Sequence, residues 1–424
     1  MGLNIEQDDR VCIVGGGPAG SFAAMHLLRL ARAHQLDLEV LVFEPRNFTQ
    51  PGPGGCNRCA GILSSRLLRA LESLDLALPK EVVQAELHAY SAHLDGEVLR
   101  IQQPDPQRQI VSVYRGGGPR MLQGEPMASF DGFLLQRACE MGAQHVPSRV
   151  RKVVLEEGQP VVHTARDRFP AALVVVATGV NSRAPLSEEF DYQAPRTEIM
   201  AQDEMPRPPD WPTDTVSAYF QEPPGLVFGA LIPKGDYVNV SLLGKGFTID
   251  TINNFIEAQG LESNYFSSTS SLCGCTPRIA VRAAHQYFGD RWVAVGDAAA
   301  TRLYKDGVGS AFFTSRAAMQ AAIHYGISKR SFKHAYAPHC RRVAQDNLYG
   351  RLLFRFWHLT LKQPRLLRAW KDTIHRESDM PAEQRVHTRV LWGMFTGDEP
   401  YRDLFQLSVS YRAVRGLWQG YRRG

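Results

Sequence analysis

The sequence predicts an α/β protein in which a Rossmann-type domain is interleaved with a mostly antiparallel β-sheet domain and followed by a helical C-terminal region. Three observations predict this class. Short apolar runs are typical of buried parallel strands, and they occur at residues 11–14, 40–43, 173–177 and 292–295. Residues 85–101 and 218–244 alternate polar and apolar side chains, as antiparallel strands do. Residues 331–424 show helical patterns rich in Leu, Phe, Trp and Arg.

The first apolar run leads into the glycine cluster GGGPAG, which is typical of nucleotide-binding turns. Gly15 permits a tight turn, Gly17 lets the backbone approach a pyrophosphate, and Gly20 lets the next helix pack closely on the strand. The positive N-terminal end of that helix would lie under the phosphates. The second strand ends in Glu44, where a carboxylate can accept hydrogen bonds from the adenosine ribose. Together these features predict a dinucleotide site.

A second pair of signals lies far along the chain. The strand at residues 292–295 ends in Gly296 and Asp297, and Gly307, Val308 and Gly309 open a long helix. This arrangement places a carboxylate and a helix N-terminus on a common ligand. An NAD site needs only the first unit, so the second pair indicates a longer ligand, FAD. No second strong GxGxxG occurs, so the reductant would be transiently bound NAD(P)H or a reduced carrier protein.

Length and composition are those of a soluble, multidomain protein. The chain has 424 residues, of which 44% are hydrophobic and 21% are charged. No basic-then-apolar leader and no apolar run of about 18 residues is visible, which predicts a cytoplasmic protein. Seven unevenly spaced cysteines fit a reducing compartment.

Positive charge gathers in the last part of the chain. Residues 331–424 contain 17 Lys/Arg and 8 Asp/Glu, an excess of nine, so the net charge of +5 leaves about −4 on residues 1–330. Four of the six tryptophans also lie there: Trp357, Trp370, Trp392 and Trp418. Two interpretations stay open, a peripheral contact with anionic membrane or helices that cover a substrate channel and extend their arginines to solvent. No nucleic-acid motif accompanies the charge, which argues against nucleic acid.

The segments GGGPAG…E, LVVVATGVNS and WVAVGDAA…DGVGSA resemble FAD-dependent oxidoreductases built like para-hydroxybenzoate hydroxylase, and most of all the geranylgeranyl reductase family. The resemblance spans residues 11 to about 325. It implies that Glu44 holds the adenosine ribose, Arg46 lies by the pyrophosphate and Asp297 holds the ribityl chain. The FAD-binding set is then Gly15, Gly17, Pro18, Ala19, Gly20, Glu44, Arg46, Val150, Thr178, Gly179, Gly296, Asp297, Gly307, Val308 and Gly309.

Three segments differ from the family pattern. Aromatic hydroxylases usually carry an acid before the glycine where this chain has Ala177-Thr178-Gly179, which disfavours a hydroxylase. The arginine that usually precedes FDxxL is replaced around residues 127–129, so one phosphate contact is unassigned. The YxWxFP motif of archaeal prenyl reductases appears only as FGALIP at residues 228–233. Flavin halogenases share the Ile-Pro ending, but their two tryptophans are missing here.

The family resemblance places the loop after residue 50 beside the isoalloxazine. Pro and Gly dominate residues 51–55, which predicts an ordered loop without helix. Cys56 and Cys59 follow and are the catalytic candidates, as redox groups or proton donors. Alternatives are simple packing, or a metal site or disulfide formed with Cys273 and Cys275.

Other polar residues are weaker candidates. His285, His334 and His339 are interpreted as surface or capping histidines. Residues 304–306, Tyr-Lys-Asp, precede the second helix and could reach a substrate, although a structural role is the simpler interpretation of each.

The predicted activity is reduction of a carbon–carbon double bond in an isoprenoid or other long apolar substrate by hydride transfer from flavin N5. The alternatives are a flavin-dependent monooxygenase or halogenase, and a non-catalytic flavoprotein for electron transfer or sensing. Predicted partners are an apolar small molecule or lipid, an electron-donor protein, and a membrane surface contacted through residues 331–424. The predicted FAD-binding segments are 1–84, 126–190 and 286–330, the substrate-domain segments are 85–125 and 191–285, and the C-terminal region is 331–424.

Overall fold

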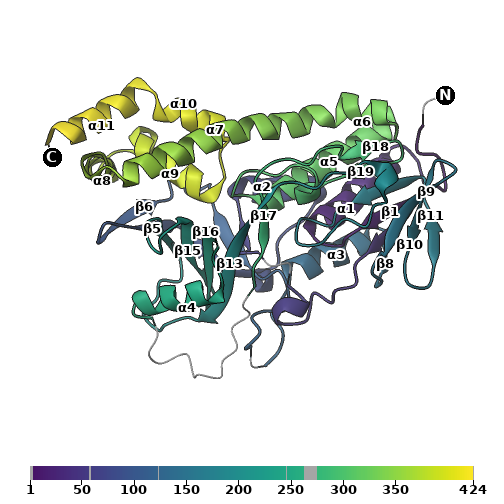
Figure 1. The fold of residues 1–424 in the computed structure, drawn as a ribbon, viewed down its shortest axis with the longest axis horizontal. Coiled ribbons are helices and arrows are strands. Elements are labelled where there is room, and N and C mark those ends of the chain that lie inside the picture. The colour runs from purple at the N-terminus through teal and green to yellow at the C-terminus, as the bar shows by residue number, and fades with distance from the viewer. Residues whose placement is uncertain (1–2, 57–58, 123, 245, 262–274, 424) are drawn as a thin grey trace.

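The computed structural model describes residues 3–56, 59–122, 124–244, 246–261 and 275–423 (Figure 1). The strands are β1 Arg10–Val14, β2 Glu39–Phe43, β3 Ile62–Leu63, β4 Val83–Leu87, β5 Ala89–Leu94, β6 Glu97–Gln102, β7 Ile110–Val113, β8 Gln144–Val146, β9 Lys152–Glu156, β10 Gln159–His163, β11 Arg168–Pro170, β12 Leu173–Val176, β13 Thr197–Pro206, β14 Thr215–Tyr219, β15 Leu226–Lys234, β16 Tyr237–Gly244, β17 Arg278–Ala280, β18 Phe288–Gly289 and β19 Trp292–Ala294. The helices are α1 Pro18–Ala33, α2 Ser65–Leu71, α3 Phe130–Glu140, α4 Ile249–Ala258, α5 Gly307–Tyr325, α6 Lys329–Ala335, α7 Ala337–Leu361, α8 Pro364–Ser378, α9 Val386–Thr396, α10 Tyr401–Ser408 and α11 Tyr411–Arg423.

One part of the molecule is built on a six-stranded sheet with the strand order β18-β19-β12-β1-β2-β8. The strands β19, β12, β1, β2 and β8 run parallel, which confirms the four apolar runs as buried parallel strands. Side chains alternate between its faces, so Val11 and Ile13 pack with α1, α3 and α5, whereas Cys12 and Val14 pack against the small sheet of β9, β10 and β11. The sheet is therefore covered on both faces (Figure 1).

The other part is built on a seven-stranded sheet with the strand order β17-β13-β16-β15-β14-β5-β6. Its neighbours pair antiparallel except β14 and β5, which run parallel. One part of this sheet packs on α4 and another part packs under the C-terminal helices. A further three-stranded sheet, β3-β7-β4, packs beside β15 of the seven-stranded sheet. The loop predicted to be helix-free contains one 3₁₀ turn, Gly52–Gly54, because Gly52 adopts a φ of +69° that tightens the chain there.

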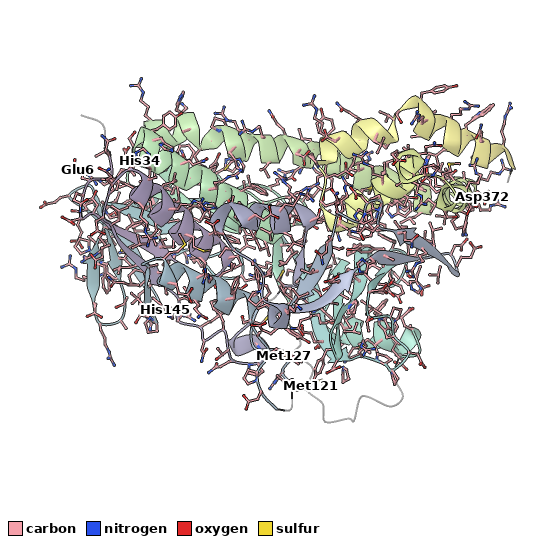
Figure 2. All side chains as sticks on the ribbon, turned by 180° about the vertical axis from the view of Figure 1, so that it is seen from behind. Glu6, His34, Met121, Met127, His145 and Asp372 are labelled. Carbon is pink, nitrogen blue, oxygen red and sulfur yellow. The ribbon has the colours of Figure 1, made fainter. Side chains whose placement is uncertain are left out.

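The C-terminal helices form a layer along one edge of the molecule, which both views show (Figures 1 and 2). Three of the four tryptophans in this layer are buried and the fourth is exposed. Trp357, Trp370 and Trp392 are buried because their helices pack against β5, β14 and β15, while Trp418 stays 52% exposed. Within the described residues, no helix is long and apolar enough to cross a bilayer.

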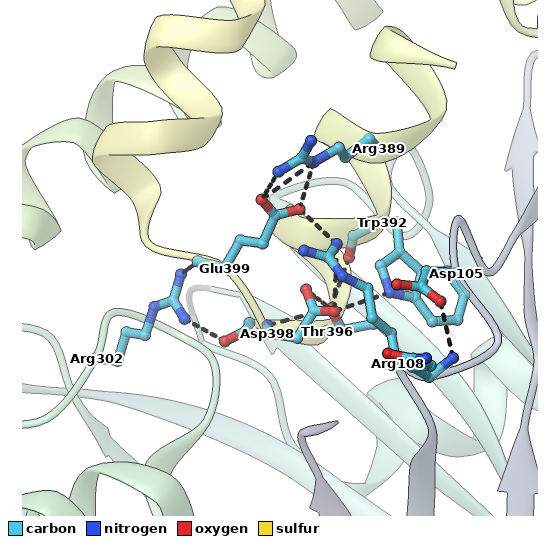
Figure 3. A network of polar contacts seen from close by, with 10 residues as sticks. Asp105, Arg108, Arg302, Arg389, Trp392, Thr396, Asp398 and Glu399 are labelled. Atoms are coloured by element: carbon cyan, nitrogen blue, oxygen red, sulfur yellow. Dashed lines mark hydrogen bonds and ion pairs between the residues drawn. The ribbon is translucent and has the colours of Figure 1, made fainter. Parts of the chain in front are cut away.

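A buried polar network fastens this layer to the rest of the chain (Figure 3). The Glu399 carboxylate accepts hydrogen bonds from Arg108 Nη1 at 2.5 Å and Arg389 Nη2 at 2.6 Å. Arg302 donates to the backbone carbonyls of Gly397 and Glu399. The network thus joins the β6–β7 connection, the segment before α5, and the turn between α9 and α10.

Removing the Glu399 charge should loosen this layer. Burial disfavours the carboxylate, but hydrogen bonds from Arg389 and Arg108 outweigh it and lower the pKa of Glu399. Its stabilisation is therefore present above the ordinary carboxyl pKa and lost as pH falls through the lowered one. We expect Glu399→Gln to reduce the free energy of unfolding by about 1.5–3 kcal/mol at pH 7 and by less at low pH, in urea titrations. Glu383→Gln, at an exposed site, is the control, and equal losses in both variants would contradict the prediction.

Candidate functional site

One large cavity of about 1130 Å³ lies between the six-stranded and seven-stranded sheets. At one end it is lined by the C-terminal ends of β1, β2 and β12, the position where open α/β sheets bind ligands. At the other end its walls are apolar and include Tyr90, Val216, Phe228, Ile232 and Phe395. The cavity therefore continues from a polar strand-end region into an apolar chamber.

Most of the predicted site residues line this cavity. They are Gly15, Gly17, Pro18, Ala19, Glu44, Arg46, Cys56, Cys59, Val150, Thr178, Gly179, Asp297, Gly307 and Val308. Gly20, Gly296 and Gly309 do not line it. A Cβ on Gly20 would lie 1.8 Å from the Gly15 carbonyl oxygen, and one on Gly309 would lie 2.3 Å from Asp306 Oδ1. These glycines permit close backbone contacts that shape the cavity from behind.

Glu44 closes the strand-end region. Its side chain is almost completely buried, its Oε2 accepts from the Gly16 amide at 3.0 Å, and its Oε1 accepts from the Arg46 amide at 3.0 Å. The Arg46 guanidinium also pairs with this carboxylate, with Nε 3.0 Å from Oε1. Glu44 therefore holds the glycine turn and Arg46 together beside the cavity.

Three buried oxygens in the cavity wall have no hydrogen-bond partner within the described part of the chain: Asp297 Oδ1, Thr178 Oγ1 and Thr301 Oγ1. Burial raises the pKa of Asp297, with Thr301 and Arg115 opposing the shift. Buried polar atoms are nearly always paired, so these oxygens fit a ligand that brings its own hydroxyl groups. Thr301 was not predicted, although it lies four residues after the Gly-Asp signal.

The end of α5 adds a third polar element to the wall. Gly307 is the first residue of α5 and lines the cavity, so the helix N-terminus, with its partial positive charge, faces the ligand space. This wall suits an extended dinucleotide that carries ribose and polyol groups. It offers such a ligand the glycines at the strand ends, three side-chain oxygens without hydrogen-bond partners among the described residues, and the end of a helix. FAD is such a molecule, and the residues present fit it.

The cysteine loop lies at the junction of two cavities. Cys56 and Cys59 line the large cavity, and both also line a small one of about 30 Å³ together with Cys275. Cys273 lies outside the described residues. Among the cysteines that are described, none is disulfide-bonded, and the described residues contain no group of three or more His, Cys, Asp or Glu side chains able to hold a metal.

Arg115 places a positive charge near the cysteine loop, and the sequence did not predict this residue as part of the site. It follows β7, is buried, and pairs through Nε and Nη2 with the two carboxylate oxygens of Asp131, the acid of the FDGFL segment. Burial opposes its charge, but Asp131 raises the pKa of Arg115, and the two loop cysteines also contribute to the shift. A charged guanidinium thus faces the cavity although the arginine expected before FDGFL is absent.

The remaining candidate residues fall into two groups, those that line the cavity and those that do not. Tyr304, Lys305 and Asp306 all line the cavity. The Tyr304 hydroxyl donates to Glu198 Oε2 at 3.3 Å, and Asp306 Oδ1 accepts from Ser64 Oγ at 2.7 Å. The three histidines, His285, His334 and His339, are not among the lining residues; the first two are exposed, and burial lowers the pKa of His339 to about 4.

No family model matches the chain. No curated protein matches it either. Solved structures do resemble it over nearly the whole length. A geranylgeranyl bacteriochlorophyll reductase-like protein from Thermoplasma acidophilum is 16% identical with a TM-score of 0.57, covering 98% of this chain and 96% of that one. A flavoprotein/dehydrogenase from Cytophaga hutchinsonii is 14% identical with a TM-score of 0.63, covering 94% and 98%.

A third similar structure is the flavin-dependent brominase Bmp2, which is 14% identical with a TM-score of 0.56 and covers 98% of this chain and 94% of its own. Identities this low establish the fold and leave the reaction open. The predicted interleaving of a Rossmann-type sheet with a mostly antiparallel sheet is confirmed. The chain therefore has the fold of the FAD-dependent oxidoreductases that its sequence motifs resemble.

Proposed function

We propose that this protein is an FAD-dependent oxidoreductase that reduces a carbon–carbon double bond in a long apolar, isoprenoid-like substrate. One observation carries the proposal: a single cavity runs from the strand ends suited to a dinucleotide to an apolar chamber lined by Val216, Phe228 and Ile232. A substrate in that chamber would lie beside the end of the cofactor without crossing solvent. Similarity to a reductase-like structure of matching length supports the same reading.

The residues that would hold FAD follow from the site. Gly15 and Gly17 would lie against the pyrophosphate, Glu44 would bind the adenosine ribose, and Asp297 would bind the ribityl chain. The N-terminus of α5 would stabilise negative charge on the reduced ring, by about 0.3–2 kcal/mol. FAD supplies the hydride chemistry, and the protein supplies position and electric field. The electron source would be NAD(P)H bound transiently or a reduced carrier protein.

We also propose that the outer face of the C-terminal layer contacts an anionic membrane. Two apolar stripes are exposed there at helical spacing, Leu348, Leu352, Phe356 and Leu359 on α7, and Tyr411, Val414, Trp418 and Tyr421 on α11. Exposed arginines flank both stripes, including Arg351 and Arg355 on α7 and Arg412 and Arg415 on α11. Exposed apolar side chains flanked by basic ones suit the interface of an anionic bilayer. The inner face of the same layer contributes Phe395 to the cavity, so covering the chamber and meeting lipid are compatible.

FAD retention tests the cofactor site. We expect Asp297→Ala and Glu44→Ala each to weaken FAD binding roughly tenfold to a hundredfold, because each removes a charged hydrogen-bond acceptor worth about 1.5–3 kcal/mol. Flavin content after gel filtration and fluorescence titration with FAD would measure this. Glu72→Ala, an exposed site outside the cavity, is the control. Full flavin content in both cavity variants would show that the ligand lies elsewhere.

Anaerobic turnover tests the reaction. The photoreduced enzyme should regain oxidised flavin absorbance when geranylgeraniol is added, and mass spectrometry should find a product with two more hydrogens. Cys56→Ser and Cys59→Ser should retain FAD, and at least one should slow the reaction if the loop takes part in it. Reoxidation only in the presence of oxygen, with substrate-stimulated oxygen uptake, would instead identify a monooxygenase or halogenase. No substrate-dependent change under either condition would leave a non-catalytic flavoprotein.

Vesicle binding tests the membrane surface. Each basic residue near an anionic bilayer contributes about 1 kcal/mol, and salt screens that term. Co-sedimentation with phosphatidylserine vesicles should fall with salt and should fall strongly after charge reversal at four exposed arginines, Arg351, Arg355, Arg365 and Arg368. Reversal of Arg166, exposed beyond β10, should have no effect. If the wild type fails to sediment at low salt, the helices serve only to cover the chamber.

A further inference from the structure

Lys305 is a cation without a partner at the inner end of the apolar chamber. It lies between the Gly-Asp turn and α5, and its side chain lines the cavity. Its Nζ lies 3.4 Å from the centre of the Phe228 ring. Among the described residues, no acceptor or carboxylate pairs with this ammonium group. An aromatic face offsets only part of the hydration that an ammonium loses on burial.

The polar groups that flank Lys305 already have partners. Asp306 accepts from Ser64, Tyr304 donates to Glu198, and Arg302 donates to the carbonyls of Gly397 and Glu399. Burial lowers the pKa of Lys305 to about 7. A half-buried ammonium group that lines a cavity and has no carboxylate of the described residues beside it can bind an anionic group of a ligand.

We propose that Lys305 binds one carboxylate of an otherwise apolar ligand, so that the acidic end of this ligand lies beside Phe228 in the chamber. The inference rests on the proposed function only in taking this ligand to be the substrate. The apolar part would occupy the space between Phe228, Ile232 and Phe395.

A single carboxylate suits this position better than a diphosphate. The guanidinium of Arg302 donates to two backbone carbonyls and lies 3.9 Å from Asp346 Oδ2, and that of Arg115 pairs with Asp131, so each already faces a carboxylate of the protein. A charge-assisted hydrogen bond between one ammonium and one carboxylate is strong where water is scarce. The substrate would then be a long apolar acid.

The affinity of the site for a carboxylate ligand should fall as pH rises. Binding of a carboxylate requires Lys305 to be protonated, and this holds below about pH 7. The ligand must be ionised, and this holds above about pH 5 for an ordinary carboxylic acid. The charged groups that share the cavity wall next to Lys305 in the chain are Asp306, Arg302 and Asp297, and of these Asp306, whose pKa burial raises to about 6, also titrates in this window. Its ionisation would add repulsion as pH rises, so both groups weaken binding in the same direction.

The test compares farnesoate with farnesol, which share a carbon skeleton. Calorimetry on the purified full-length chain with its bound cofactor should show farnesoate binding about tenfold or more tightly than farnesol at pH 6. This preference should shrink between pH 6 and pH 8. Lys305→Met should abolish the preference and its pH dependence while changing farnesol binding less than about twofold. Lys305→Arg should retain a preference, and Lys333→Met, an exposed control, should behave as the wild type.

A second measurement needs no variant. Competitive acetylation followed by peptide mass spectrometry should show that farnesoate protects Lys305 and that farnesol does not. Failure of farnesoate to bind the wild type, a carboxylate preference that survives Lys305→Met, or equal protection by both probes would overturn the inference. Because neither measurement requires turnover, these outcomes are separate from those of the anaerobic reduction assay, which tests the proposed function.

Discussion

The buried guanidinium of Arg302 makes the contact on which the cavity depends. Its two donors bind carbonyl oxygens of the turn between α9 and α10, and its backbone belongs to the segment that carries Asp297 at one end and α5 at the other. One side chain therefore fixes the C-terminal layer against the wall of the ligand site. Removing a buried charge from its partners is costly, so the layer is an integral part of the cavity.

The sequence predicts those parts of the fold that arise from residues close together in the chain. The β1–α1–β2 unit, the Gly-Asp turn and the start of α5 are local patterns, and the structure places them together at the strand ends. It could not predict pairs that form across the fold. Arg115 meets Asp131 because β7 ends beside the start of α3, and periodicity alone could not show that three tryptophans face the seven-stranded sheet.

The two main sheets contribute different walls to the cavity. The six-stranded sheet supplies turns and acceptors, whereas the seven-stranded sheet supplies an apolar wall. Structures named as a reductase-like protein and as a brominase share the fold of this chain. Phe228, Lys305 and Phe395 are among the side chains that face the chamber.

The position of Phe395 and Thr396 in the cavity wall has a consequence for biosynthesis. A ribosome makes the chain from its N-terminus, and domains fold in that order. The strand ends, Asp297 and α5 are all synthesised before the turn that Arg302 holds. The nascent protein would thus pass through a stage in which the six-stranded sheet and α5 are complete and the chamber is still open on one side, so that a large ligand could enter before the last wall is added.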